Sequence, residues 1–444
     1  MKIFKGLRIN SILKINLYFQ SMQEDFLHYL WKYKKFESTN LQTTNGEAVS
    51  IKSLGTHNHN AGPDFFNAQI TIGGQLWAGN VEIHIKSSDW FVHNHEVDLN
   101  YDNVILHVVW QHDTDVFRKD NTAIPTLELK KYVHLSALNN YQKLFNSKST
   151  WINCENEINQ ISDFIFNNWL ERLFFERLEQ KAKVINVVLE QSKNNWEAVL
   201  FKLLAKNFGL KINGEAFLSV ANSFDFSVVM KQQNSLQNLE ALFFGQAGLL
   251  EKDVQDAYFL KLKKDYVFLS QKFGLKNSNV LPMQFFRLRP PNFPTIRWSQ
   301  LANLYAQHKN LFSKIIDCKT KEDIYDIFKV STSEYWDTHY TFGKVSKKVS
   351  KKISTSFIDL LIINTIVPLK FCYAKQQGKD IDEKLTQLLS QVSAEKNSII
   401  DKFDSLNVKA TSALHSQALL QLKNEYCNKN KCLQCAVGNT LLTN

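Results

Sequence analysis

Hydrophobic residues recur at two different periods along the chain, and the change of period divides it into two parts. The first apolar run has helical spacing and predicts a helix over Glu24–Phe36. Extended runs follow, and the glycine pair Gly73-Gly74 between two of them predicts a hairpin turn. The extended runs lie near Leu41–Leu54, Phe65–Ile72, Trp77–Ile85, Val104–Trp110 and Thr126–Leu129.

The second part is helical. The last long extended run, Val104–Trp110, is almost entirely apolar, which is typical of a strand buried on both faces. From Ser162 onward, apolar residues recur at three- and four-residue steps with charges between them, as in Trp169–Leu189. This order predicts an α+β fold, with a mixed sheet in an N-terminal domain over 22–150 and a large all-helical domain over 151–420. A cysteine-containing segment over 421–444 completes the chain.

The first 21 residues have a different character. They are basic, and their apolar residues are too scattered for the core of a signal peptide. The run 16–21, Asn-Leu-Tyr-Phe-Gln-Ser, resembles a protease-cleavage linker, and a start codon placed too early would leave a similar extension. Either origin predicts a disordered extension over 1–21, with the folded protein beginning near Met22.

The composition is that of a soluble globular protein, with 44% hydrophobic and 22% charged residues. The most apolar stretch, Phe357–Phe371, is interrupted by charged and polar residues, so it predicts a buried helix rather than a membrane span. Six cysteines in 444 residues do not form a secreted disulfide framework. We therefore expect a cytoplasmic protein that is not bound to a membrane.

Acidic and basic side chains are expected on one face of the predicted hairpin. Asp64 opens one strand, and Glu82, His84 and Lys86 occupy alternate positions of the next, where they project to the same side. Two carboxylates brought together in this way hold a hard divalent cation. An imidazole or amine beside them handles a proton or a phosphate. The structural alternative is a turn at Asp64, a solvent-facing Glu82 and a His84 packed at the sheet edge.

Histidines are concentrated in the same region. Of the 12 histidines in the chain, more than half lie between positions 57 and 112. They are His57, His59, His84, His93, His95, His107 and His112. A lone histidine is usually a structural residue, but these accompany the acidic pair, and His93 and His95 follow it directly. A histidine-rich metal hydrolase acting on an unrelated substrate is therefore a further hypothesis.

The predicted element order, with Pro-Asp on one strand and Glu-x-His on the next, resembles the PD-(D/E)XK nuclease superfamily. The resemblance implies a restriction-endonuclease-like mixed sheet and a Mg²⁺ or Mn²⁺ ion bound by Asp64 and Glu82. It places His84 where the superfamily usually carries a lysine that activates water, with Lys86 as a substitute, and Glu24 as the acid on the first helix. The implied function is metal-dependent hydrolysis of phosphodiester bonds. The alternative is a non-catalytic nucleic-acid or protein interaction module on a degenerate nuclease fold.

Nearly all of the chain from Met22 also resembles an uncharacterised bacterial family, the domain-of-unknown-function family numbered 2851. The resemblance rests on short segments in both predicted domains and at the C-terminus. They are residues 24–31, 60–65, 81–84, 87–90, 105–110, 292–297 and 432–435. This resemblance implies no particular activity.

Three of the cysteines form a C-x4-C-x2-C pattern near the C-terminus. They are Cys427, Cys432 and Cys435. Thiolates at this spacing suit zinc or an iron–sulfur cluster, and a fourth ligand must come from Cys154, Cys318, Cys372 or a histidine. Some nucleases of the superfamily above hold their ends together with one early and three late cysteines, so the resemblance favours Cys154. The simpler alternative is three free thiols at a frayed terminus.

The predicted helical part is basic, and this points to nucleic acid as a partner. Residues 151–444 carry 38 Lys and Arg against 29 Asp and Glu, whereas residues 22–150 carry 11 against 14. Lysine and arginine bind phosphates, and aromatic residues among them can stack on bases. The candidate phosphate contacts are Arg287, Arg289, Arg297, Lys347 and Lys348. The alternative is a solvated helix surface over an aromatic core.

Overall fold

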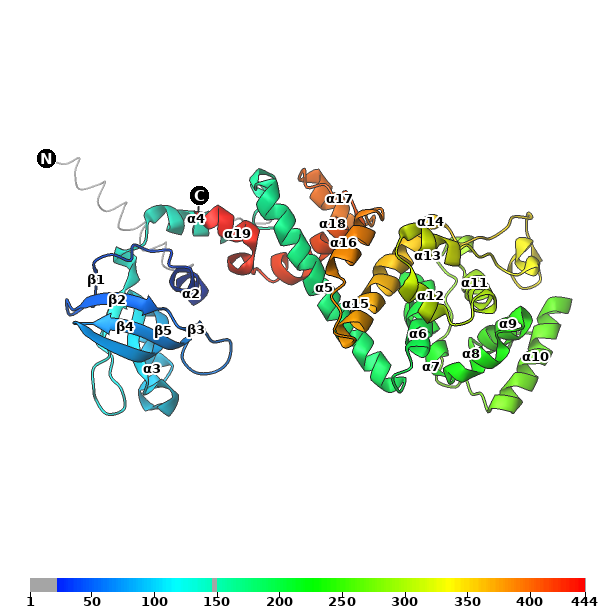
Figure 1. Ribbon diagram of the computed structural model, residues 1–444, viewed down its shortest axis with the longest axis horizontal. Helices are drawn as coiled ribbons and strands as arrows, with labels where there is room; N and C mark the ends of the chain where they lie inside the picture. The colour runs from blue at the N-terminus through cyan, green and yellow to red at the C-terminus, as the bar shows by residue number, and fades with distance from the viewer. Residues whose placement is uncertain (1–21, 146–149, 444) are drawn as a thin grey trace. The chain divides into compact units, whose positions relative to one another are not determined.

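The computed structural model describes residues 22–145 and 150–443. The predicted extension over 1–21 lies outside the described residues. The described chain forms two compact units, and the C-terminal segment from Lys423 belongs with the residues up to Phe166 in the first of them (Figure 1). The second unit is Asn167–Leu422. The predicted α+β class is confirmed, because the first unit contains a mixed sheet and the second is mainly helical.

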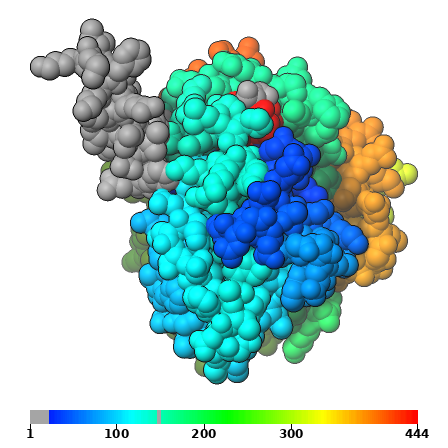
Figure 2. All heavy atoms as spheres, turned by 90° about the vertical axis from the view of Figure 1, so that its left-hand side faces the viewer, coloured from blue at the N-terminus to red at the C-terminus, as the bar shows by residue number. Residues whose placement is uncertain are grey.

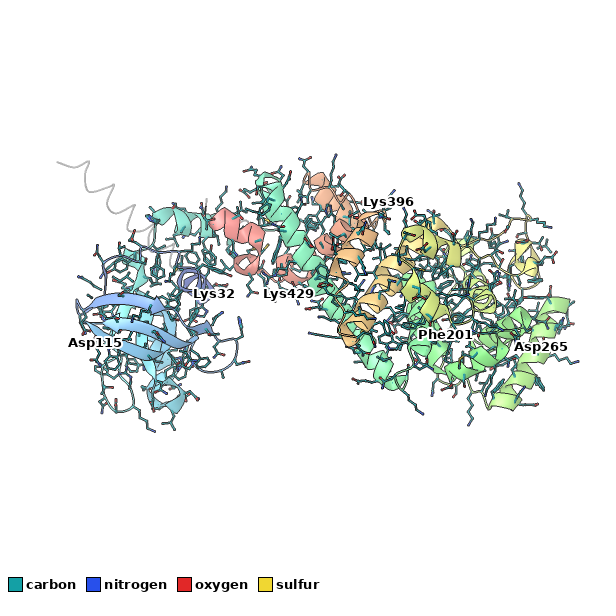
Figure 3. The ribbon with its side chains drawn as sticks, in the orientation of Figure 1. Lys32, Asp115, Phe201, Asp265, Lys396 and Lys429 are labelled. Carbon is teal, nitrogen blue, oxygen red and sulfur yellow. The ribbon has the colours of Figure 1, made fainter. Side chains whose placement is uncertain are left out.

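Helix α2 (Glu24–Lys32) opens the first unit and is shorter than the predicted helix. Its apolar face packs on the sheet at β5, with Phe26 and Leu30 fully buried. The helix ends at Lys32, labelled in Figure 3, because Lys34 adopts a left-handed conformation with φ of 49°. On the surface of this unit, the blue segment with α2 lies beside the cyan segment with α4 (Leu135–Phe145) (Figure 2). In the interior, the buried ring of Phe26 stacks on that of Tyr141.

The sheet follows the order β1-β2-β4-β5-β6-β7, and β3 pairs with β4. Neighbours are antiparallel from β1 to β5 and parallel from β5 to β7. The predicted hairpin at Gly73-Gly74 is confirmed, but the predicted run Leu41–Leu54 is divided into β1 and β2 by a turn at Gly46. The strands are β1 (Leu41–Gln42), β2 (Ala48–Ser53), β3 (Thr56–His57), β4 (Phe65–Ile72), β5 (Gln75–Lys86), β6 (Val104–Gln111) and β7 (Thr126–Glu128).

A short helical connection joins β5 to β6, because parallel neighbours require a crossover. It consists of α3 (Asp89–Val92), η2 (His95–Val97) and η3 (Leu99–Tyr101). Trp90 anchors it, since its ring is fully buried and its indole N–H donates to the carbonyl of Phe117 at 3.2 Å. This connection carries two histidines to the end of the sheet where Glu82 lies.

The C-terminal segment closes the first unit through η9 (Leu422–Cys427), η10 (Cys432–Gln434) and α19 (Ala436–Thr443). Helix α19 packs against α4, and η10 lies near α2. A Cβ atom at Gly438 would lie 2.0 Å from the carbonyl oxygen of Cys432, so only glycine permits this close approach. Lys429, labelled in Figure 3, lies between Cys427 and Cys432.

The second unit is built almost entirely from helices, and Phe201, labelled in Figure 3, lies in its core. The predicted all-helical character needs one correction, because β8 (His339–Thr341) and β9 (Lys344–Val345) form a two-stranded ribbon. The helices are α5 (Asp163–Gln191), α6 (Trp196–Phe208), α7 (Leu210–Asn222), α8 (Phe226–Gln232), α9 (Leu236–Gln246), α10 (Ala257–Phe273), α11 (Pro294–Gln307), α12 (Leu311–Asp317), α13 (Lys321–Ile327), α14 (Thr355–Leu361), α15 (Val367–Gln376), α16 (Asp382–Ser390), α17 (Ser398–Ser405) and α18 (Ala413–Gln421).

One helical segment of the described chain, Thr355–Gln376, is long and apolar enough to cross a membrane by these two measures alone. Most of it is buried inside the second unit, and Leu361, Ile362 and Ile366 are fully buried. It runs through α14, a π-helical turn (Ile362–Ile366) and α15. The buried helix predicted over Phe357–Phe371 is therefore confirmed.

Candidate metal centre

Asp64 and Glu82 lie side by side where β4 and β5 pair. The backbone N–H of Asp64 donates to Oε2 of Glu82 at 3.1 Å, and the backbone N–H of Ile83 donates to Oδ2 of Asp64 at 2.9 Å. Each carboxylate is thus fixed by the backbone beside the other one. Glu82 is only 5% exposed, so the structural alternative of a solvent-facing Glu82 is wrong.

Two imidazoles lie near the second carboxylate oxygen of Glu82, and a third lies beside one of them. Nε2 of His84 lies 3.6 Å from Oε1 of Glu82, and Nε2 of His95 lies 3.3 Å from the same atom. Nδ1 of His93 lies 3.0 Å from Nε2 of His84. One nitrogen from each of the three histidines lies within 4.8 Å of the others, and this is the one such ligand group found in the described part of the chain.

These spacings match those of ligands around one metal ion. With metal–nitrogen bonds of about 2.0–2.1 Å, tetrahedral ligands are separated by roughly 3.3 Å. The three measured separations are 3.0, 3.3 and 3.6 Å. His84, His93 and His95 can therefore offer nitrogens to one metal ion, and Oε1 of Glu82 lies next to two of these histidines.

His107 supports His84 from behind. It is fully buried on β6, and its Nε2 lies 2.8 Å from Nδ1 of His84. If Nδ1 of His84 carries the proton and donates a hydrogen bond to Nε2 of His107, then Nε2 of His84 has a lone pair that can bind metal. A partner of this kind fixes the orientation of a ligating histidine.

Burial sets the charge states in this cluster. It raises the pKa of Glu82 to about 9, and the neighbouring Asp64 adds to the increase. It lowers the pKa of His84 to about 2 and that of His107 to about 3, with further effects from the neighbouring histidines. His84 and His107 are therefore neutral, which is the form of imidazole that binds metal, and a divalent cation would supply the charge that holds Glu82 ionised.

Helix α2 contributes two further groups. Nε2 of His28 lies 3.1 Å from Oδ2 of Asp64. Burial alone would lower the pKa of His28, but the hydrogen bond and charge of Asp64 outweigh it and the net pKa is raised. Glu24, one turn earlier, has its pKa raised by burial and is within electrostatic reach of His93 and Asp64, so the structure brings this predicted acid to the site. His28 was missed by the sequence analysis, although its four-residue spacing from Glu24 puts both on one helix face.

The remaining predicted residues of the sheet lie at the margins of this cluster. His57 packs between His28 and His59, with ring centroids 5.6 and 4.4 Å away, and burial lowers its pKa to about 4. Lys86 is exposed at the end of β5, and its charge acts on Asp113. Lys86, predicted as a substitute for the usual lysine, is therefore exposed to solvent, whereas the predicted His84 lies together with His93 and His95.

A family model described as protein of unknown function (DUF2851) matches residues 24–398. The match covers most of the chain, including all the residues of the histidine and carboxylate cluster. The chain belongs to this family. No curated protein and no solved structure matches the chain.

The cysteine segment of this DUF2851 chain lies beyond the matched range. Cys154 is brought together with the three C-terminal cysteines, while Cys318 and Cys372 lie in the second unit. Burial raises the pKa of Cys427 to about 12 and that of Cys432 to about 11, and the neighbouring thiols add to both increases. The side-chain amide of Asn153 donates to Sγ of Cys432 at 3.4 Å. The prediction that Cys154 joins the cluster agrees with this arrangement.

The predicted phosphate contacts fall into two groups. Four are exposed in the second unit, where they can meet a ligand from solvent. They are Arg287, Arg289, Lys347 and Lys348. Arg297 differs, because it is only 6% exposed within α11 and does not lie on the protein surface with the other four.

Proposed function

We propose that this protein is a metal-dependent hydrolase whose metal ion is bound by His84, His93, His95 and Glu82. The observation that carries the proposal is the convergence of three histidine nitrogens within 4.8 Å of one another, with Oε1 of Glu82 next to two of these histidines. Three protein nitrogens and one oxygen leave room for a water molecule if the ion takes a fifth ligand, as catalytic zinc ions do in the transition state.

The ligand set favours a transition metal over Mg²⁺. Imidazole suits zinc, iron, nickel and copper, whereas Mg²⁺ prefers oxygen ligands and retains several waters. Mn²⁺ accepts both oxygen and nitrogen and remains a candidate. The expectation of Mg²⁺ or Mn²⁺ between Asp64 and Glu82 is thus revised toward Mn²⁺, Fe²⁺ or Zn²⁺ beside Glu82.

The residues around the proposed metal ion would then have separate chemical roles. A bound divalent ion would lower the pKa of a coordinated water molecule. Asp64 orients His28 through the 3.1 Å contact, and this pair lies beside the metal ligands where it can accept or return a proton. Glu24, on the same face of α2, is a further acid within reach.

Phosphodiesters are the proposed substrate class. The support is the sheet itself, in which an acid-bearing helix precedes the β4–β5 hairpin and a helical crossover leads to the parallel strand β6. This is the element order expected from the resemblance to PD-(D/E)XK nucleases. His84 takes the position of the usual lysine, and in this arrangement it is a metal ligand rather than a base.

The test combines metal analysis with cleavage assays. Protein freed of metal is reloaded with Mn²⁺, Fe²⁺, Zn²⁺ or Mg²⁺ and incubated with single- and double-stranded DNA and RNA. We expect one equivalent of a transition metal and metal-dependent cleavage, both lost in His93→Ala. Asp64→Ala should retain the metal and lose cleavage. His134→Ala, an exposed histidine outside the cluster, is the matched control and should behave as the unsubstituted protein.

Two results would contradict the proposal. Cleavage that survives Asp64→Ala would indicate a contaminating nuclease. Stoichiometric metal binding without cleavage of any of these substrates would favour the non-catalytic interaction module on a degenerate nuclease fold.

We also propose that Cys154, Cys427, Cys432 and Cys435 bind zinc or an iron–sulfur cluster. The support is their convergence from two distant parts of the chain in buried surroundings. No three of these described thiols lie within 4.8 Å of one another, whereas sulfurs around one zinc ion are separated by roughly 3.8 Å. The wider spacing favours the larger iron–sulfur group. Anaerobically purified protein should be brown and contain iron, and Cys154→Ser should be colourless; colourless, metal-free protein would exclude both groups.

A further inference from the structure

The second unit contains a pocket of about 260 Å³ whose walls carry positive charge without any acid. It is lined by residues that precede and begin α11 and by the segment after β9. Arg297, Lys351 and Lys352 supply the cationic groups, and Asn292 and Gln300 supply amides.

Arg297 is the central feature of this pocket. Its Nη1 donates to Oε1 of Gln300 at 2.9 Å, and its Nη2 donates to Oδ1 of Asn292 at 2.6 Å. The guanidinium carbon lies 3.7 Å from the ring centroid of Phe357. Its Nε is buried without a hydrogen-bond partner, and none of the described carboxylates forms an ion pair with it.

A buried guanidinium without a carboxylate is unusual, because removing a charge from water costs free energy that a counter-charge must offset. Neutral amides and an aromatic face offset only part of this cost. Burial lowers the pKa of Arg297 to about 10, and no acid opposes that shift. The side chain is therefore held ready for an anion that the protein itself does not provide.

Lys351 adds to the positive field without serving as a direct ligand. It is 6% exposed, and its ammonium group donates to the carbonyl oxygens of Trp336, Asp337 and Val349. Its three donors are thus occupied by the backbone. Lys352 is exposed and lines the pocket, so its ammonium group is free to approach a ligand from the solvent side.

We propose that this pocket binds a single phosphate group, with the Arg297 guanidinium as its principal partner and Lys352 at its entrance. Arginine recognises tetrahedral oxyanions through its planar set of N–H donors. The volume suits one phosphate and part of its substituent and is too small for a duplex. The exposed Arg287 and Arg289 are separate from this pocket, and the assignment does not depend on the metal centre in the first unit.

The group can be inorganic phosphate, a mononucleotide or the phosphorylated end of a nucleic acid, and calorimetric titration distinguishes them. The full-length protein, freed of metal, is titrated with inorganic phosphate, a nucleoside monophosphate, and a short oligonucleotide with or without a 5′ phosphate. We expect the protein to bind every phosphomonoester that the pocket admits. If nucleic-acid ends are the natural ligand, the 5′-phosphorylated oligonucleotide should bind more tightly than its unphosphorylated form.

Substitutions locate the binding. Arg297→Gln should weaken phosphate binding at least tenfold, and Lys352→Gln, at an exposed position where folding is not at risk, should weaken it about threefold. Arg289→Gln is the matched exposed control, and His93→Ala, which removes a proposed metal ligand, should leave phosphate binding unchanged. The proposal would be overturned if the unsubstituted protein did not bind phosphate, or if Arg297→Gln and Lys352→Gln bound it as tightly as the unsubstituted protein does. Neither result would affect the proposed hydrolase.

Discussion

Glu82 in the first unit and Glu240 in the second are both buried, with 5% and 1% of their surfaces exposed, but their neighbours differ in kind. Glu240, on α9, accepts hydrogen bonds from hydroxyl and indole groups only. The donors are Ser299 at 2.5 Å, Ser333 at 2.9 Å, Trp336 at 3.2 Å and the hydroxyl of Tyr258. Glu82 receives one backbone N–H and otherwise faces imidazole nitrogens.

The difference separates a structural acid from a candidate ligand. Four donors supplied by the chain complete the surroundings of Glu240, as buried polar groups require. The neighbours of Glu82 are imidazoles, which can bind metal, and in the proposed site a cation would complete the arrangement. Both residues are buried, and burial raises the pKa of both. The chemical identity of the groups around each glutamate, rather than its burial, therefore separates a structural role from a proposed metal-binding role.

The largest difference is expected in metal affinity when each carboxylate is exchanged in turn for an amide of the same shape. Glu82→Gln should weaken metal binding at least about 100-fold, because even outer partners of metal ligands contribute 10- to 100-fold. Glu240→Gln should bind metal as the unsubstituted protein does. Competition with a chromophoric chelator measures both affinities. Equal affinities in the two variants would remove the distinction between the two glutamates.

Removing the carboxylate of Glu240 altogether should act on stability instead. Glu240→Ala leaves the hydroxyls of Ser299 and Ser333 and the indole of Trp336 without their acceptor, and we expect a loss of about 3 kcal/mol in the free energy of unfolding. Urea denaturation followed by circular dichroism measures it. The exposed Glu171→Ala on α5 is the control and should change stability by less than about 0.5 kcal/mol. A similarly small change in Glu240→Ala would show that the hydrogen bonds do not support the fold.

The sequence predicts the metal centre better than the Glu240 network, because the centre is more local. Alternation along one strand is enough to place Glu82 and His84 on one face, and Gly73-Gly74 places Asp64 opposite them. The positions of His93 and His95 depend on a left-handed turn at Asn94, with φ of 58°, which no periodicity reveals. This is why the sequence predicts Mg²⁺ or Mn²⁺ between two carboxylates, whereas the site proposed above also includes histidine nitrogens.

The surroundings of Glu240 depend on contacts between distant segments. Three of its partners are 59 to 96 residues away from it, and the fourth, Tyr258, lies 18 residues away on α10. In the sequence, Glu240 is simply a charged residue in an apolar helix. Arg297 shows the same limit, since its charge predicts a surface contact and only helix packing reveals that it is buried. Hydrophobic patterns along the sequence are enough to predict the order of the helices and the burial of the Thr355–Gln376 segment. They do not predict which polar side chains from different helices form hydrogen bonds with one another.

A smaller effect is expected from His107, which touches a proposed ligand but not the ion. His107→Phe preserves the volume and burial of the side chain and removes the 2.8 Å contact with Nδ1 of His84. Metal affinity should fall by about tenfold, less than in Glu82→Gln, because the ligand atoms remain in place. Calorimetric titration with Mn²⁺ or Zn²⁺ tests this, with His112→Ala outside the cluster as the control. A loss as large as that of Glu82→Gln would make His107 part of the ligand set.

The smallest effect concerns the pH dependence of stability in the second unit. Burial raises the pKa of Glu240 above its usual value of 4.5, and the hydrogen bonds from Ser299 and Tyr258 oppose the shift only in part. The folded state therefore holds this proton more tightly than the unfolded state does. The resulting stabilisation is fully present below pH 4.5 and is lost as pH rises through the folded-state pKa. Glu240→Gln cannot titrate, so the stability of the unsubstituted protein relative to this variant should decrease from pH 4 toward pH 8 in urea denaturation series. A difference that is constant over this range would mean that Glu240 is ionised in the folded protein as readily as in water, and that its four donors fully offset the effect of its burial.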